Sequence, residues 1–211
     1  EMESDYVTFL TQPGIDGKIP VVTEFPIAAR GMLRFCALGL PSFDRDTEKL
    51  YFQKDCESPK VEQLIDDIRN LDGRRLLVLT HSAQFTEVTV ARLQDAGIRA
   101  VEWRGGVSAT KRNQIIKDFQ AGEIDAIVGV ISAMGTGTDG LQEAAYNVVW
   151  LSVDDDASNV VQGVGRLDRL GQKHRVTMFE YRMLRTYDVG HLDSQITKQL
   201  ELNKSLKAGK R

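Results

Sequence analysis

The chain has 211 residues, of which 42% are hydrophobic and 27% charged, with a formal net charge of -3. This length and apolar content allow one domain of ordinary core size, with or without an appendage. No apolar stretch approaches the roughly 18 residues that span a bilayer, and the N-terminus lacks a secretory signal pattern, so we expect a cytoplasmic (nucleoid) or nuclear location. Cys36 and Cys56 have neither the number nor the spacing of a zinc site or a disulfide framework.

The first sixty residues differ in character from the rest of the chain. Residues 1–57 hold four of the five prolines, and their pattern predicts a helix over 26–39 and a hairpin through 43–53. We therefore expect an appendage over 1–57, a lobe over 58–190, and a C-terminal helix with a basic tail over 191–211. The first residue is not methionine, and we expect the chain to be a piece of a longer protein.

From about residue 75 onward, short apolar runs alternate with amphipathic stretches, a pattern typical of a parallel sheet covered by helices. Strands are predicted at 75–80, 98–103, 124–131, 146–152 and 175–181. Helices are predicted at 58–71, 84–97 and 108–122, because each stretch has a serine cap at its start or a glycine at its end. The sequence therefore predicts an α/β fold.

A glycine-rich stretch, SAMGTGTDGLQ at 132–142, follows the third predicted strand. Its GxGxxG pattern and the acidic residues at 154–156 suggest a dinucleotide-binding turn, and hence an NAD-dependent oxidoreductase. Only five residues separate Gly140 from the next strand, however, whereas a parallel crossover takes about 10 to 12. The oxidoreductase is therefore the weaker alternative. The loop can also place backbone amides near an anion, or serve as a tight turn.

The stretch QGVGRLDRLGQ, at 162–172, ends a predicted helix over 157–169. Its Arg166 and Arg169 would lie one helical turn apart, where both guanidiniums can address one polyphosphate. In phosphoryl transfer, an arginine supplied by a second domain neutralises charge that develops on the phosphate. The alternative is a solvated basic face bridged to Asp168.

This stretch resembles motif VI of superfamily-two helicases, especially Swi/Snf-type ATPases, whose pattern is Q-x-x-G-R-x-x-R-x-G-Q. The match is full at Gln162, Gly165, Arg166, Arg169, Gly171 and Gln172. Other stretches resemble the opening helix of the second lobe, motif IV and motif V. The resemblance implies a second (C-terminal) RecA-like lobe, a parallel sheet flanked by helices, with an N-terminal helical and hairpin appendage.

The sequence contains neither a GxxxxGK[ST] phosphate loop nor a DExH or DEAD string. A complete ATPase is therefore not expected from these residues, and the isolated chain should hydrolyse essentially no ATP. The resemblance implies that Arg166 and Arg169 are arginine fingers that reach ATP, which the absent first lobe holds with Mg. Gln162 and Gly165 would shape the helix that presents them.

Motif V carries a second set of implied roles at the nucleotide. Asp139 would contact the ribose hydroxyls, and Gly137 would allow the backbone to approach closely. Asp139 as an ordinary turn residue is the alternative, because aspartate favours such positions for local hydrogen bonding.

Loops that follow parallel strands gather at one edge of the sheet, where the resemblance implies that DNA, or RNA, lies. Hydroxyls, backbone amides and one charge there would bind phosphates without reading bases. The residues implied are Thr80, His81, Ser82, Arg104, Gly105, Gly106, Ser132 and Thr136.

The resemblance as a whole implies the C-terminal motor lobe of an ATP-dependent DNA helicase or translocase. Its partners would be DNA and the first RecA-like lobe of the same full-length chain. A non-catalytic DNA-binding or regulatory module is the alternative from another functional class.

Overall fold

The computed structural model describes residues 26–47, 49–71, 75–134, 139–152, 162–184 and 186–190. A five-stranded sheet with the order β4-β5-β3-β6-β7 forms its centre, and all neighbouring strands in it are parallel. The strands are β3 (Arg75–Thr80), β4 (Ala100–Trp103), β5 (Ala126–Val130), β6 (Ala145–Trp150) and β7 (Thr177–Glu180). All five predicted strands are confirmed, four of them shorter than predicted.

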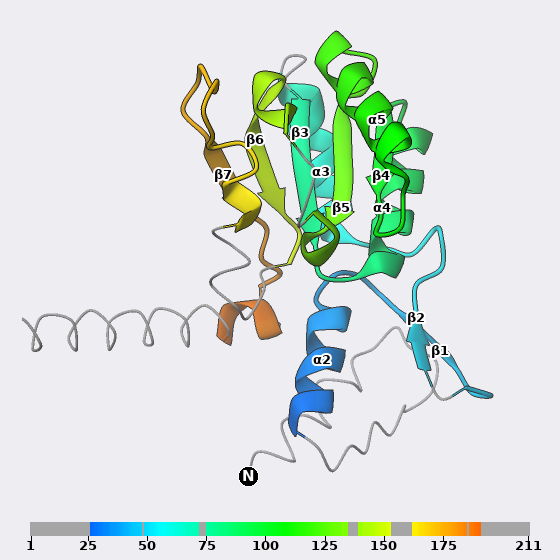
Figure 1. Cartoon of the computed structure of the whole chain (residues 1–211). Helices are drawn as coiled ribbons and strands as arrows, with labels where there is room; N and C mark the ends of the chain where they lie inside the picture. Colours follow the sequence, from blue (N-terminus) through cyan, green and yellow to red (C-terminus); the bar gives the residue numbers. More distant parts are fainter. Residues whose placement is uncertain are drawn as a thin grey trace, which may run out of the picture.

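Helices cover both faces of this sheet (Figure 1). Helices α3 (Pro59–Asn70) and α4 (Ala83–Asp95) pack on one face, and α5 (Ala109–Ala121) packs on the other. Each begins at a serine whose side chain accepts a hydrogen bond from the backbone N–H three residues later, as an N-cap does. The three predicted helices are thereby confirmed.

The central strand β3 shows why the apolar runs are continuous rather than alternating. Leu76 and Val78 belong to the core under α3 and α4, whereas Leu77 and Leu79 belong to the core under α5. All four are fully buried, and each contributes roughly 1.5–3 kcal/mol to the free energy of unfolding. A parallel strand covered on both faces needs apolar residues at successive positions.

The appendage consists of α2 (Pro26–Cys36) and a two-stranded antiparallel hairpin, β1 (Ser42–Asp44) with β2 (Lys49–Tyr51). It lies at the end of the sheet where the strands finish (Figure 1). The ring of Phe52 stacks on Phe35 with centroids 4.0 Å apart and lies 4.9 Å from Phe85 of α4. The predicted helix and hairpin are confirmed, and aromatic packing joins them to the lobe. The predicted C-terminal helix lies outside the described residues.

Within the described ranges, no helix has the length and apolar character needed to cross a membrane. The same residues contain no group of three or more His, Cys, Asp or Glu side chains placed to hold a metal ion. Cys36 and Cys56 are free thiols, and burial raises the pKa of the Cys36 thiol to about 11.

Candidate functional site

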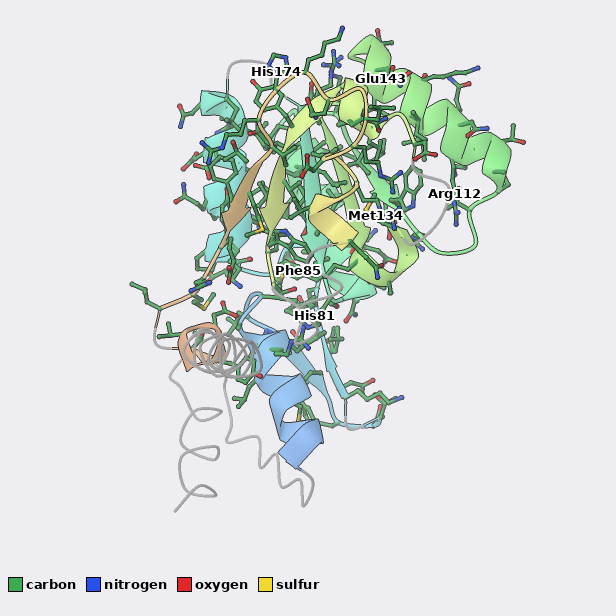
Figure 2. The ribbon with its side chains drawn as sticks, turned by 60° about the vertical axis from the view of Figure 1, so that its left-hand side comes forward. His81, Phe85, Arg112, Met134, Glu143 and His174 are labelled. Atoms are coloured by element: carbon green, nitrogen blue, oxygen red, sulfur yellow. The ribbon has the colours of Figure 1, made fainter. Side chains whose placement is uncertain are left out.

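The carboxyl ends of all five strands lie at the same edge of the sheet, because all neighbouring strands are parallel. His81, directly after β3, marks this edge and lies near α2 (Figure 2). His174 and Glu143 lie at the opposite edge in the same view. The candidate site extends from the first edge along the α5 side of the sheet.

The motif VI stretch is helical over 162–164 and then continues as turns. The predicted helix through residue 169 is therefore wrong in its last part, and Arg166 and Arg169 lie on a turn rather than on a helical face. The reason is local: Gly165 O accepts a 2.7 Å hydrogen bond from Nε of Arg169, while the Arg169 amide donates to Leu167 O. The carbonyl that would extend the helix is thus bonded to a side chain.

Three charged side chains meet on this turn. Arg169 forms a close ion pair with Asp139 of the motif V loop, with the Arg169 side chain 31% exposed and that of Asp139 86% exposed. Arg166 is buried, and burial followed by the charge of Arg169 lowers its pKa, while Asp139 opposes that change. One carboxylate thus binds Arg169 and acts on the charge of Arg166, and two guanidiniums beside a single acidic group suit a polyanionic ligand.

This cluster joins residues that the sequence assigned to one nucleotide. Arg166, Arg169 and Asp139 are brought together across 30 positions of the chain. Gln162 is exposed at the beginning of the motif, and Gly165 is partly buried. Asp168, the carboxylate of the alternative interpretation, is exposed, and Arg169 pairs with Asp139 instead.

The motif V loop leaves β5 through the short 3-10 helix η1 (Ile131–Met134) and reaches β6 through η2 (Leu141–Glu143). Gly137 and Thr136 lie outside the described residues. Gly140 has a φ of 106° and its carbonyl accepts a 3.0 Å hydrogen bond from Gln120 of α5. The three-residue η2 offers no crossover helix for a pyrophosphate, so the dinucleotide alternative lacks its main structural element.

The loop after β3 uses its polar side chains internally. Thr80 and Ser82 are buried; Ser82 caps α4, and the Ser82 amide donates to Thr80 Oγ1 at 3.3 Å. His81 is partly buried, with Nδ1 2.6 Å from Ser152 Oγ. The hydroxyls of Thr80 and Ser82 therefore do not face solvent, and a direct phosphate contact stays a prediction for His81.

The loop after β4 is open to solvent. Arg104 is 55% exposed and pairs with Glu87 at 2.8 Å and Glu102 at 2.5 Å. Gly105 and Gly106 beside it are exposed, as is Ser132 on η1. Their predicted contacts with nucleic acid remain predictions, and two carboxylates already neutralise the Arg104 charge.

Comparison with known proteins decides the family. Residues 59–171, more than half of the chain, match the helicase conserved C-terminal domain. The chain belongs to this helicase family. This match confirms the predicted resemblance to the C-terminal lobe of a helicase, and the solved structures described below confirm the RecA-like α/β fold class.

This helicase domain matches only part of each of its longer relatives. The chain is 30% identical over 138 residues, 63% of its length, to RNA polymerase-associated protein RapA of Pseudomonas fluorescens, of which it covers 14%. It is 28% identical over 130 residues, 61% of its length, to ATP-dependent RNA helicase RhlB of Xanthomonas oryzae pv. oryzae, of which it covers 22%. The chain thus spans less than a quarter of either relative.

Two solved structures share the fold of this helicase domain. The C-terminal part of the Fun30 ATPase domain matches with a TM-score of 0.59 and 16% identity, over 64% of this chain and 44% of that one. The Hef helicase domain of Pyrococcus furiosus matches with a TM-score of 0.53 and 22% identity, over 66% and 29%. At these identities the likeness concerns the fold alone.

Two residues of the helicase motif have structural roles that the sequence interpretation missed. A Cβ at Gly163 would lie 2.6 Å from Trp150 Cζ2 and 2.9 Å from Leu79 Cδ1, so motif VI packs directly on the sheet there. Gln172 Nε2 donates to Ala145 O at 2.9 Å, and this hydrogen bond connects the end of the turn to β6. The sequence did carry one signal for the packing at Gly163, because a glycine inside a predicted helix often allows close packing.

Proposed function

We propose that this chain is the C-terminal motor lobe of an ATP-dependent DNA helicase or translocase of the Swi/Snf type, working with a first RecA-like lobe. The observation that carries the proposal is the cluster of Arg166, Arg169 and Asp139, held on a turn that packs against β6. Membership of the helicase family and the match to RapA support it. RNA is the alternative nucleic acid, as the name of RhlB indicates.

The residues present fit one side of an ATP site. Arg166 and Arg169 are permanently charged forked donors; Asp139 pairs with Arg169, and its charge also acts on Arg166. In the proposal the first lobe holds most of the nucleotide and its Mg, while these two arginines face the phosphates. ATP, when bound, supplies the phosphoanhydride bond whose hydrolysis lets the lobes separate.

The proposal assigns distinct tasks to the two arginines. Arg166 is buried, so its guanidinium has few alternative positions and its desolvated charge acts strongly on a nearby phosphate. Arg169 is bound at Nε by Gly165 O and at its terminal nitrogen by Asp139, so its fork is fixed in direction. Rigid donors that face a developing charge stabilise a transition state without reorganising at the moment of reaction.

Nucleic acid is proposed to bind at the carboxyl edge of the sheet through its phosphates. The exposed groups there are Arg104, Gly105, Gly106 and Ser132, with His81 partly exposed. Backbone contacts of this kind hold a strand without reading its sequence, as a translocase requires. Alternating binding by two lobes would then move the protein along DNA.

The test is Arg166→Ala in the protein that joins this lobe to a first RecA-like lobe. We expect DNA-stimulated ATP turnover to fall roughly 10³-fold, because arginine fingers contribute on the order of 10³ to 10⁵ in rate. The control is Arg69→Ala, since the Arg69 side chain is 59% exposed and lies 4.0 Å from Asp66. DNA affinity without nucleotide should stay unchanged in both variants.

Two outcomes would contradict this proposal. Retained turnover in the Arg166 variant, together with intact DNA binding, would favour a DNA-binding or regulatory module. Robust ATP hydrolysis by the isolated 211 residues would contradict the division of the site between two lobes.

A further inference from the structure

A buried lysine at the start of α3 joins three segments of the chain. The Lys60 side chain is 3% exposed, and its Nζ donates to Leu151 O at 2.5 Å and pairs with Asp188 Oδ2 at 2.6 Å. Burial lowers the pKa of Lys60, and the charge of Asp188 opposes this. A buried cation near a helix N-terminus is disfavoured by desolvation and by the helix dipole. The presence of a buried lysine at this position therefore does not serve the stability of α3 itself.

The acidic partner belongs to the segment that follows β7. Asp188 is 13% exposed and also accepts a 2.9 Å hydrogen bond from the amide of Met183. Thr186 Oγ1 donates to Met183 O at 2.7 Å, which closes the same turn. The side chains of Thr186 and Asp188 thus both bond to the backbone of Met183, and Asp188 attaches this segment to α3.

A continuous path of contacts leads from this attachment to motif VI. Lys60 holds the carbonyl of Leu151, the residue directly after Trp150 at the end of β6. The indole of Trp150 is the surface on which Gly163 packs, and Gly163 O accepts the amide of Arg166 at 3.2 Å. Each step is a packed contact or a hydrogen bond between described residues.

We propose that Lys60 is a positioning residue for Arg166, and that Asp188 holds Lys60 in place. Lys60 fixes the end of β6, so the segment after β7 determines where Trp150, Gly163 and Arg166 lie. A small displacement of a catalytic group can lower a rate about 100-fold. The effect on ATP turnover rests on the proposed function, whereas the effect on the Trp150 contact does not.

The test compares Lys60→Met with the double variant Lys60→Met/Asp188→Asn. The single variant leaves a buried carboxylate without its cation and is expected to unfold at lower urea concentration. The double variant removes that charge, keeps an acceptor for the Met183 amide, and is expected to recover most of the urea midpoint. It still leaves Leu151 O without the Lys60 donor, so stability and positioning are separated.

The readout that needs no activity is Trp150 fluorescence in a Trp103→Phe background, where Trp150 is the only tryptophan. We expect the double variant to show more acrylamide quenching than its parent. With a first lobe present, kcat should fall roughly tenfold to 100-fold while the affinity for DNA stays the same. The matched control is Arg69→Gln/Asp66→Asn, which removes an exposed pair from the same helix.

Each outcome decides between positioning and simple stabilisation. Parent-like Trp150 quenching and kcat in the folded double variant would overturn the inference and leave the pair as a structural ion pair. Changed quenching with an inactive Arg166→Ala control supports both proposals. Changed quenching with a fully active Arg166→Ala variant keeps the path of contacts and contradicts the proposed function instead.

Discussion

The motif VI turn and the loop after β3 belong to the same lobe, but they differ in how far their polar side chains are exposed and in what those side chains bind. On the motif VI turn, Arg169 remains partly exposed while it binds the exposed Asp139 of the motif V loop. In the loop after β3, Thr80 and Ser82 are buried, and their hydroxyls bond to the backbone of the same loop and of α4. The first region keeps charged groups accessible to a ligand, and the second uses its hydroxyls to build the fold.

Side-chain length explains this difference. A serine directly before a helix lies within reach of the first free amides, so capping is its most favourable role. A guanidinium reaches beyond its own turn, and Arg169 binds Gly165 O with Nε while its terminal nitrogen extends to Asp139. Residue type and position after a strand are therefore insufficient to assign a short hydroxyl side chain to a ligand.

Among the variants that test this comparison, the largest effect is expected from Gly163→Ala, which breaks the packing of motif VI. A methyl group there would lie 2.6 Å from the Trp150 ring, so the turn must shift. We expect the free energy of unfolding to fall by about 1–3 kcal/mol and ATP turnover by roughly 100-fold. Urea denaturation and steady-state turnover in the two-lobe protein measure the two quantities.

Gly31→Ala is the control for that experiment. Gly31 is exposed on α2, and a Cβ there would meet no atom within 4 Å. Alanine should stabilise that helix by about 0.5–1 kcal/mol. If the Gly163 variant shows the same gain with full turnover, the motif VI turn does not depend on contact with Trp150.

A smaller effect is expected from Asp139→Asn, which tests whether this carboxylate contacts the ribose or only orients Arg169. The ribose role predicts that the KM for ATP rises by roughly tenfold with an unchanged kcat, because one hydrogen bond is worth about 0.5–1.5 kcal/mol. It also predicts that the parent protein prefers ATP to 2′-deoxy-ATP and that the variant does not. A fall in kcat with equal use of both nucleotides would assign Asp139 to Arg169 instead.

Most of the lobe was predictable from the sequence, because its elements depend on local patterns. The apolar runs, the Ser58 and Ser108 caps and the left-handed glycine at Gly122 all act within a few residues. The end of the motif VI helix was not predictable in this way. The Arg169 side chain binds the Gly165 carbonyl and also Asp139 of another loop, and no sequence pattern predicts that pair of bonds.

The candidate site was predictable to a different degree at each position. The family resemblance assigned Arg166, Arg169 and Asp139 to one nucleotide, and the structure pairs Arg169 with Asp139, whose charge also acts on Arg166. The sequence offered no indication of Lys60, whose partner Asp188 is distant in the chain. The glycine within the predicted helix indicated close packing at Gly163 but did not identify Trp150 as the partner. Contacts between residues that are far apart in the sequence leave no local sequence pattern, unless both residues belong to known motifs.

The smallest effect is expected from Ser82→Ala, compared with Ser132→Ala at an exposed position of η1. Ser82 Oγ accepts the Phe85 amide at 3.2 Å, so its loss should lower the free energy of unfolding by about 1 kcal/mol. Ser132 is exposed, and its removal should leave stability unchanged while weakening DNA binding a few-fold, as loss of one phosphate contact would. Urea denaturation and fluorescence anisotropy with labelled DNA measure both variants. Weaker DNA binding by the Ser82 variant at unchanged stability would show that this hydroxyl contacts the ligand, because a capping residue cannot be removed without weakening its helix.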